Sequence, residues 1–245
     1  MPFAVDNWVT LSFAMAVAMS AGLLRGATGF GSSLVLAPIL ARLFGPVEAV
    51  AVSLMLGATG SLQMLPRHVR DLHAPAVRTI GLAGLLCLVP GVLILHMVSA
   101  EAMRHVIAIG SLAVAAALLA MPSYAGPMGR GPSLVAGALG GLIMGATSMG
   151  GPPVVLYLVS RDGGVRQTMA NIVAVVGSLE VGAILLLLLT GLLHGQTALR
   201  FAWLWPAFAV GTWVGQRVLH ERLGPRYRPV ILVLLMLVGI VSLIG

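Results

Sequence analysis

Charged residues are scarce in this sequence, and lysine is absent. Only 9% of the 245 residues are charged, whereas a soluble domain carries about 25%. Hydrophobic residues make up 59% of the chain. A composition this poor in charge excludes an ordinary soluble domain and predicts an all-α polytopic membrane protein, with the lipid bilayer as its first partner.

Cysteine and metal-ligand patterns are equally sparse. The single cysteine, Cys87, lies inside a long apolar run, so no intramolecular disulfide is possible. No pair of histidines has a convincing metal-ligand spacing, and we predict neither a metal nor another cofactor. The first apolar stretch is preceded by Asp6 and by no basic residue, which is the reverse of a secretory signal. It is therefore interpreted as the first membrane segment.

The sequence divides into ten apolar pieces when glycine, proline and charged residues are used as the boundaries between them. A membrane crossing needs about 20 apolar residues, and several of these pieces are shorter than that. The piece at 152–160 is too short to span alone. The predicted pieces are 8–24, 29–44, 47–65, 79–98, 102–121, 133–148, 152–160, 167–190, 198–216 and 229–244.

The 14 basic residues are all arginine, and they stand singly or in short groups between the apolar pieces. This distribution indicates that the arginines orient the chain in the membrane. No nucleic-acid partner is predicted. If each piece reverses the side of the membrane, only Arg42, Arg104 and Arg200 fall on one side and eleven arginines on the other. Because cytoplasmic loops collect arginine, both termini are predicted outside.

The chain also contains an internal duplication, whose first sign is "GATGFGSS" at Gly26 and "GATSMGGPP" at Gly145. At the offset of 119 residues that relates these motifs, further identities occur on both sides. After a small shift, His96 and His220 also correspond. We therefore predict a repeat at 1–121, a linker loop at 122–132 and a second repeat at 133–245. The first-half residues of the main matches are Gly22, Leu23, Gly26, Ala27, Thr28, Gly31, Val35, Gly45 and Ala51.

Each half holds about five hydrophobic segments, which is an odd number. The second half therefore starts from the opposite face, and the two repeats are predicted to be inverted, with eight to ten helices or half-helices in all. Secondary transporters commonly have this architecture, and their substrate site lies near the midplane where the repeats meet.

The two glycine-rich motifs are unfavourable inside a helix. We predict that the helices break at these motifs, or that the chain re-enters the membrane there. Irregular backbone at membrane depth persists only where protein or a cavity satisfies it. Glycines allow a ligand to approach the backbone, and a helix that restarts after a break presents free N–H groups. Two such elements from opposite faces would form a pocket for a small oxyanion. The alternative is that the glycines serve close helix packing.

The residues predicted to bind substrate come from the two motifs. From the first they are Gly26, Ala27, Thr28, Gly29, Phe30, Gly31, Ser32 and Ser33, and from the second Gly145, Ala146, Thr147, Ser148, Met149, Gly150, Gly151 and Pro152.

Paired glycine-rich motifs, duplicated halves and this length together resemble the TauE/SafE family of sulfite exporters and related anion permeases, over essentially the whole chain. The resemblance implies a secondary transporter, and in particular an exporter, of sulfite, thiosulfate or organosulfur anions such as sulfonates. It also implies coupling to an ion gradient, a bacterial-type plasma (inner) membrane and a small anionic substrate. A homodimer is left open.

Four polar residues outside the motifs are candidates for coupling or for the pathway. Glu180 lies in the middle of an apolar piece, where a charge is costly, and it is a candidate proton carrier. A protonated Glu180 hydrogen-bonded between helices is the alternative. Arg25 could attract an anion, although membrane topology or snorkelling is the favoured interpretation. Gln63 and Asn171 could line a pathway or form interhelical hydrogen bonds.

Two other function classes compete with a transporter. An anion channel could use the same pocket and would differ in saturation and in its dependence on a proton gradient. A membrane-embedded enzyme would need a nucleophile with a base, or a metal cluster, and neither pattern is visible in the sequence. The chain is therefore not predicted to be an enzyme.

Overall fold

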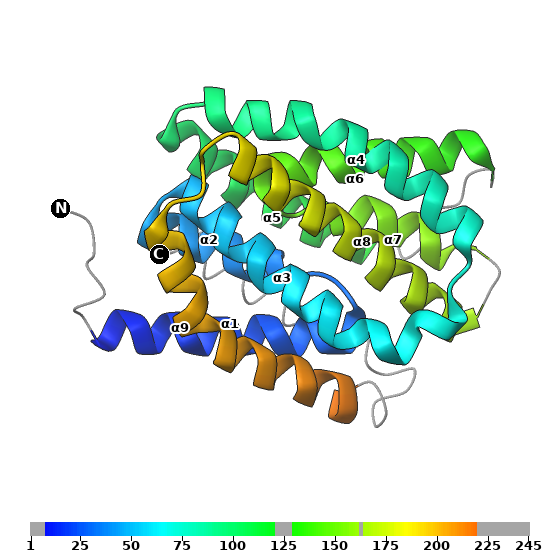
Figure 1. Cartoon of the computed structure of the whole chain (residues 1–245), viewed down its shortest axis with the longest axis horizontal. Coiled ribbons are helices and arrows are strands. Elements are labelled where there is room, and N and C mark those ends of the chain that lie inside the picture. The colour runs from blue at the N-terminus through cyan, green and yellow to red at the C-terminus, as the bar shows by residue number, and fades with distance from the viewer. Residues whose placement is uncertain (1–7, 121–128, 162–163, 220–245) are drawn as a thin grey trace.

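The computed structural model describes residues 8–120, 129–161 and 164–219, and over these ranges every regular element is a helix (Figure 1). The tenth apolar piece, at 229–244, and most of the predicted linker loop lie outside the described residues. Each of the other nine predicted pieces corresponds to one helix. The helices are α1 (Trp8–Thr28), α2 (Ser32–Phe44), α3 (Pro46–His68), α4 (Ala74–Met97), α5 (Ala100–Ala120), α6 (Arg130–Thr147), α7 (Gly151–Val159), α8 (Gly164–Leu189) and α9 (Gly195–Val214), with short helical turns at Val69–Asp71 and Gly215–Leu219.

The helices differ in whether they are long enough to cross a membrane. Four helices in the described part of the chain are long and apolar enough to cross a membrane, and they are α1, α3 with the turn that follows it, α4 and α8. By contrast, α2 has 13 residues and α7 has nine. At about 1.5 Å per residue neither short helix reaches across a hydrocarbon core of about 30 Å.

The boundaries of the helices follow the spacing of the sequence duplication. α1 ends at Thr28 and α6 at Thr147, while α2 begins at Ser32 and α7 at Gly151. Both pairs of positions are 119 residues apart, so each glycine-rich motif contains the end of one helix and the start of the next. The intervening residues need unusual backbone angles, with φ of 81° at Gly29, 85° at Gly31 and 62° at Ser148. Glycine adopts such angles without strain, which explains its use in these breaks.

Two helix pairs pack with almost no side chain between them. In the pair α1–α9, a Cβ added at Gly22 or Gly26 would overlap the carbonyl of Phe208 or Thr212. In the pair α4–α6, a Cβ added at Gly145, the second-half counterpart of Gly26, would overlap the carbonyl of Leu88 in the same way. Small residues at helix contacts let backbones approach closely, and they are common where helices associate in membranes.

The centre of the molecule is the contact between α3 and α8, on which the other helices pack. Followed by colour in Figure 1, α1, α3 and α9 run from left to right, whereas α4, α6 and α8 run from right to left. Within each of the pairs α1 and α6, α3 and α8, and α4 and α9, the two helices therefore run in opposite directions. The prediction of an all-helical protein with membrane-spanning helices is confirmed over the described residues.

At one end of α3 a polar contact joins the two halves. Arg200 of α9 forms an ion pair with Glu48 in the first turn of α3, with 3.0 Å between Nη1 and Oε2. The Thr197 hydroxyl donates to the other carboxylate oxygen at 2.9 Å. The guanidinium of Arg200 also lies 4.5 Å from the centre of the Phe44 ring, a cation–π geometry that adds a modest attraction.

Candidate functional site

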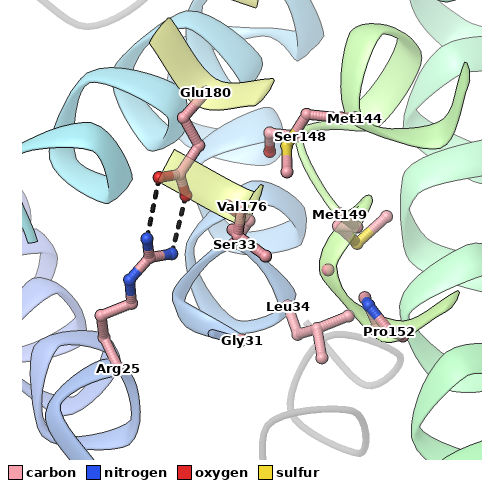
Figure 2. A pocket seen from close by; sticks show the side chains of 11 residues that line it. Arg25, Gly31, Ser33, Leu34, Met144, Ser148, Met149, Pro152, Val176 and Glu180 are labelled. Atoms are coloured by element: carbon pink, nitrogen blue, oxygen red, sulfur yellow. Dashed lines mark hydrogen bonds and ion pairs between the residues drawn. The ribbon is translucent and has the colours of Figure 1, made fainter. Parts of the chain in front are cut away.

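A small cavity lies between the two helix breaks and is lined by residues of both (Figure 2). Gly31, Ser33 and Leu34 come from the start of α2, and Ser148, Met149, Gly151 and Pro152 come from the second break and the start of α7. Helices α1, α6 and α8 complete the wall with Arg25, Met144, Val176 and Glu180.

The first turns of α2 and α7 both face this cavity. Ser33 lies in the first turn of α2, and Gly151 and Pro152 lie in the first turn of α7. Neither helix start has a side-chain cap. The start of a helix has a positive dipole end and free N–H groups, which favour an anion nearby. In α7 the dipole is the larger contribution, because Pro152 and Pro153 of its first turn have no N–H. Two uncapped helix starts at one cavity therefore create an environment suited to a negative charge.

Arg25 and Glu180 form an ion pair at the edge of the cavity, and both side chains are only 1% exposed. Arg25 Nη1 donates to Glu180 Oε1 at 2.7 Å and Nη2 donates to Oε2 at 2.8 Å, as Figure 2 shows. Ser61 of α3 completes the cluster, because its hydroxyl accepts from Arg25 Nη2 and donates to Glu180 Oε2 at 2.9 Å. Arg25 Nε has no hydrogen-bond partner among the described residues.

A buried ion pair is weak evidence for stability. Taking both charges out of water costs about as much as their attraction returns, and well-packed apolar residues often replace such a pair without loss. Removing one partner alone is strongly destabilising, because the other charge remains buried. An ionisable residue inside a membrane segment is by default a functional residue, and here two of them line the same cavity.

The Arg25–Glu180 pair corrects one interpretation made from sequence. Topology or snorkelling was the favoured role for Arg25, yet its side chain is buried and points to Glu180 rather than to a membrane surface. It therefore cannot count toward the arginine bias, which leaves ten arginines against three. Sequence spacing missed the pair because the two residues are 155 positions apart.

Each break is stabilised by a threonine at equivalent positions. The Thr28 hydroxyl accepts from the N–H of Phe30 at 3.3 Å and lies 2.8 Å from the carbonyl of Leu24. The Thr147 hydroxyl donates to the carbonyl of Ile143 at 2.8 Å and accepts weakly from the N–H of Met149 at 3.4 Å. Both hydroxyls are thus engaged with backbone at the break in this conformation.

The residues of the two motifs divide into three groups. Gly31, Ser33, Ser148, Met149, Gly151 and Pro152 line the cavity. Gly26 and Gly145 lie at close helix contacts, as in the packing alternative. The others surround the breaks without appearing in the cavity wall, and they are Ala27, Thr28, Gly29, Phe30, Ser32, Ala146, Thr147 and Gly150. Among these, Phe30 packs directly against Gly151, so the two motifs are in contact.

Gln63 and Asn171 lie away from the cavity wall. Gln63 Nε2 donates to the carbonyl of Ala209 at 3.2 Å, which joins α3 to α9. Asn171 Oδ1 accepts from the backbone N–H of His73 at 2.9 Å and so ties α8 to the segment before α4. Both side chains make the interhelical contacts that were the alternative to a pathway role.

Four residues of the site were not selected from the sequence. Leu34, Met144 and Val176 line the cavity, and Ser61 bridges the ion pair. The duplication contained a signal for two of them, because at the offset of 119 residues Met144 corresponds to Arg25, and Ser61 corresponds to Glu180.

The cavity is small in this conformation. Its volume is about 10 Å³, counted as the space open to the centre of a water molecule. That is near the minimum for a single water molecule. A sulfur oxyanion needs more room than this, so in this conformation the cavity is closed to an anion of that size.

Comparison with known proteins gives one match. A family model described as "Sulfite exporter TauE/SafE" matches residues 14–242, which is most of the chain. No curated protein and no solved structure matches the chain.

Proposed function

The chain belongs to the TauE/SafE family of sulfite exporters, and on that premise we propose that it is a secondary transporter that exports sulfite or small organosulfur anions across a bacterial-type plasma membrane. The family is one of membrane transporters, and several helices are long and apolar enough to span. The proposal of an anionic substrate rests on the cavity shared by the two helix breaks, with the buried Arg25 in its wall.

The chemistry of the cavity supports a small anion as the substrate. Arg25 supplies a fixed positive charge, and a guanidinium binds planar or trigonal oxyanions through paired N–H groups. The uncapped starts of α2 and α7 add dipoles of the same sign, and Ser33 and Ser148 add hydroxyls. Glu180 is the only acid among the described residues of the wall, and it is already paired with Arg25. An anion with oxygen acceptors fits this set better than a cation does.

We propose that the halves are inverted repeats that provide alternating access around this cavity. The reciprocal contacts support it, since α1 packs on α9 while their counterparts α6 and α4 pack on each other. The opposite helix directions in Figure 1 support it as well. So does the hydrogen bond between Ser61 and Glu180, because equivalent residues of two halves can touch only near the axis that relates them.

The proposed orientation places both termini outside. Arg67 lies in the last turn of α3, Arg78 near the start of α4 and Arg166 in the first turn of α8. These helix ends lie at the same end of the molecule in Figure 1. Arg42 at the end of α2 and Arg200 near the start of α9 lie at the other. The end with more arginine is proposed to be cytoplasmic.

Proton coupling is proposed through Glu180. Its carboxylate lies within a candidate membrane span and borders the cavity. A proton bound to it would therefore be exposed to the same side of the membrane as the substrate in the cavity. No other acid lines this cavity in the part of the chain that the structure describes. A channel with the same pocket remains the second candidate, favoured only by the shared cavity, and it predicts flux that neither saturates nor responds to a proton gradient.

The test is an uptake assay with the purified protein in liposomes. Labelled sulfite, thiosulfate, sulfoacetate and sulfate are offered with and without a proton gradient. We expect saturable movement of at least one sulfur anion and faster movement when the gradient is imposed. If none of the four moves or competes, the substrate class is wrong. If movement is linear in concentration and ignores the gradient, the channel is the better description.

A further inference from the structure

We infer that Arg25 is the residue that binds the substrate anion, and that Glu180 takes the place of the anion on Arg25 whenever the cavity is empty. The inference rests on the proposed function and deepens it, because it names the group that ties anion binding to proton binding.

Geometry carries the first step. The carboxylate of Glu180 uses both terminal nitrogens of Arg25, at 2.7 and 2.8 Å. A sulfite or sulfonate group presents its oxygens to a guanidinium in the same paired manner. An anion that uses the same two terminal nitrogens competes with Glu180 for Arg25. A further donor of Arg25, Nε, is buried and has no hydrogen-bond partner among the described residues.

The surroundings of Glu180 leave Arg25 as the group that decides its charge. From α1 comes Arg25, and from α3 come Ser61 and Gly57, of which only Arg25 is charged. The helices α4, α6 and α7 bring no charged side chain to it in the described ranges. The residues they place nearby, or against the adjoining turns of α8, are Gly84, Leu85, Leu88, Met144, Gly151 and Pro152.

Charge balance gives the second step. When an anion displaces Glu180 from Arg25, a carboxylate would be left buried, unpaired and close to a second negative charge, which is very costly in a low-dielectric site. A proton taken up by the carboxyl removes that cost, and Ser61 remains beside it as a hydrogen-bond partner. Anion and proton are therefore bound together and released together, with one proton for each anion that Arg25 binds. Because the two move in the same direction, export is driven by the outward gradient of the anion and not by an inward proton gradient.

The same geometry explains why the two halves differ at this position. The counterpart of Arg25 in the second half is Met144, which faces the same cavity. A second arginine there would offer the anion and the carboxylate separate partners, and their competition would be lost. Arg25 is the only cation that the described residues place in the wall, so the anion and the carboxylate compete for it.

The experiment measures anion binding and proton uptake with the whole protein in detergent. Thiosulfate is the first probe, because its charge is constant through the neutral range and any pH dependence then belongs to the protein. Wild-type protein is expected to take up one proton per thiosulfate bound in weakly buffered solution, and to bind thiosulfate more tightly in mildly acidic than in mildly alkaline buffer. Sulfite is measured in parallel at a single alkaline pH.

Two variants separate the roles of the pair. Glu180→Gln keeps the size of the side chain and leaves Arg25 free, so at alkaline pH it is expected to bind either anion roughly tenfold more tightly than wild type, or better. Its binding should be independent of pH and take up no proton. Arg25→Met/Glu180→Gln removes both charges, which avoids a lone buried charge and favours folding. It is expected to fold and to lose binding by at least about 100-fold.

The outcomes are distinct. Anion binding by wild type without proton uptake overturns the inference, even if Glu180→Gln fails to fold. Wild-type affinity in the folded double variant overturns it as well. Transport by wild type combined with either result leaves the proposed function standing. If wild type neither binds nor moves any of the sulfur anions, both the proposed function and the inference are wrong.

Discussion

Gly57 of α3 lies directly against the carboxylate of Glu180 on α8, where any Cβ would overlap Oε1. The absence of a side chain at Gly57 thus leaves the space in which the carboxylate reaches Arg25. A residue with no polar side chain of its own therefore sets the position of the buried ion pair, because α3 and α8 approach so closely at this level.

Replacement of Gly57 by alanine is expected to push the carboxylate away from Arg25. Overpacking of this kind typically costs about 1–3 kcal/mol, and thermal unfolding in detergent should report it. Gly131→Ala is the matched control, since a Cβ there meets nothing within 4 Å. Equal thermal unfolding midpoints for the two variants would show that the space beside Glu180 can hold a methyl group at position 57.

Gly26→Ala and its counterpart Gly145→Ala are expected to lower stability. The added methyl group would overlap the backbone of α9 in the first case and of α4 in the second, so both helix pairs must separate. We expect a cost of about 1–3 kcal/mol in each, measured by thermal unfolding. Anion affinity of the protein that remains folded should be near that of wild type. A stable variant with lost affinity would instead place these glycines in the binding site.

Ser148 and Gly29 occupy equivalent positions with the same left-handed backbone, at φ of 62° and 81°. Ser148→Gly removes the strain of a side chain in that region, worth about 1 kcal/mol, and should leave the thermal midpoint unchanged or raised. The reverse change, Gly29→Ser, adds strain and brings a Cβ within 2.7 Å of the Met169 sulfur, so it should lower the midpoint.

Transport by Ser148→Gly provides the second measurement at this position. Its hydroxyl lines the cavity, and we expect a higher half-saturating anion concentration at preserved stability. Unchanged transport would remove the Ser148 hydroxyl from the site.

Arg200→Met is expected to destabilise the contact between α3 and α9. Glu48 would keep its hydrogen bond from Thr197 and lose its ion pair, at a side-chain exposure of only 15%. An unpaired group of this kind costs about 1–3 kcal/mol. The double variant Arg200→Met/Glu48→Gln should recover most of the thermal midpoint. Failure to recover would mean that the cost comes from lost packing of Arg200 on Phe44 instead.

The sequence predicted the elements of this fold well because apolar length and glycine breaks are local properties. In the part of the chain that the structure describes, nine predicted pieces correspond to nine helices, and the breaks at Gly29 and Ser148 lie inside the predicted motifs. Close packing at Gly26 was foreseen only as an alternative, since a glycine that admits a ligand and one that admits a helix look alike in sequence.

The pairing of Arg25 with Glu180 could not be predicted in the same way. The two residues come from different halves and meet only because α1 and α8 both pack on α3. Arg25 stands at the end of an apolar piece, where sequence suggests a membrane surface, but α1 continues to Thr28 and the arginine is buried before the helix ends.

The most direct measurement of the central claim is a structure of the protein determined with sulfite or thiosulfate bound. We predict one anion between Arg25, Ser33 and Ser148, at the starts of α2 and α7, with Glu180 separated from the guanidinium and a cavity wider than in the closed conformation. An anion bound at another place, while the Arg25–Glu180 pair stays intact, would contradict the account.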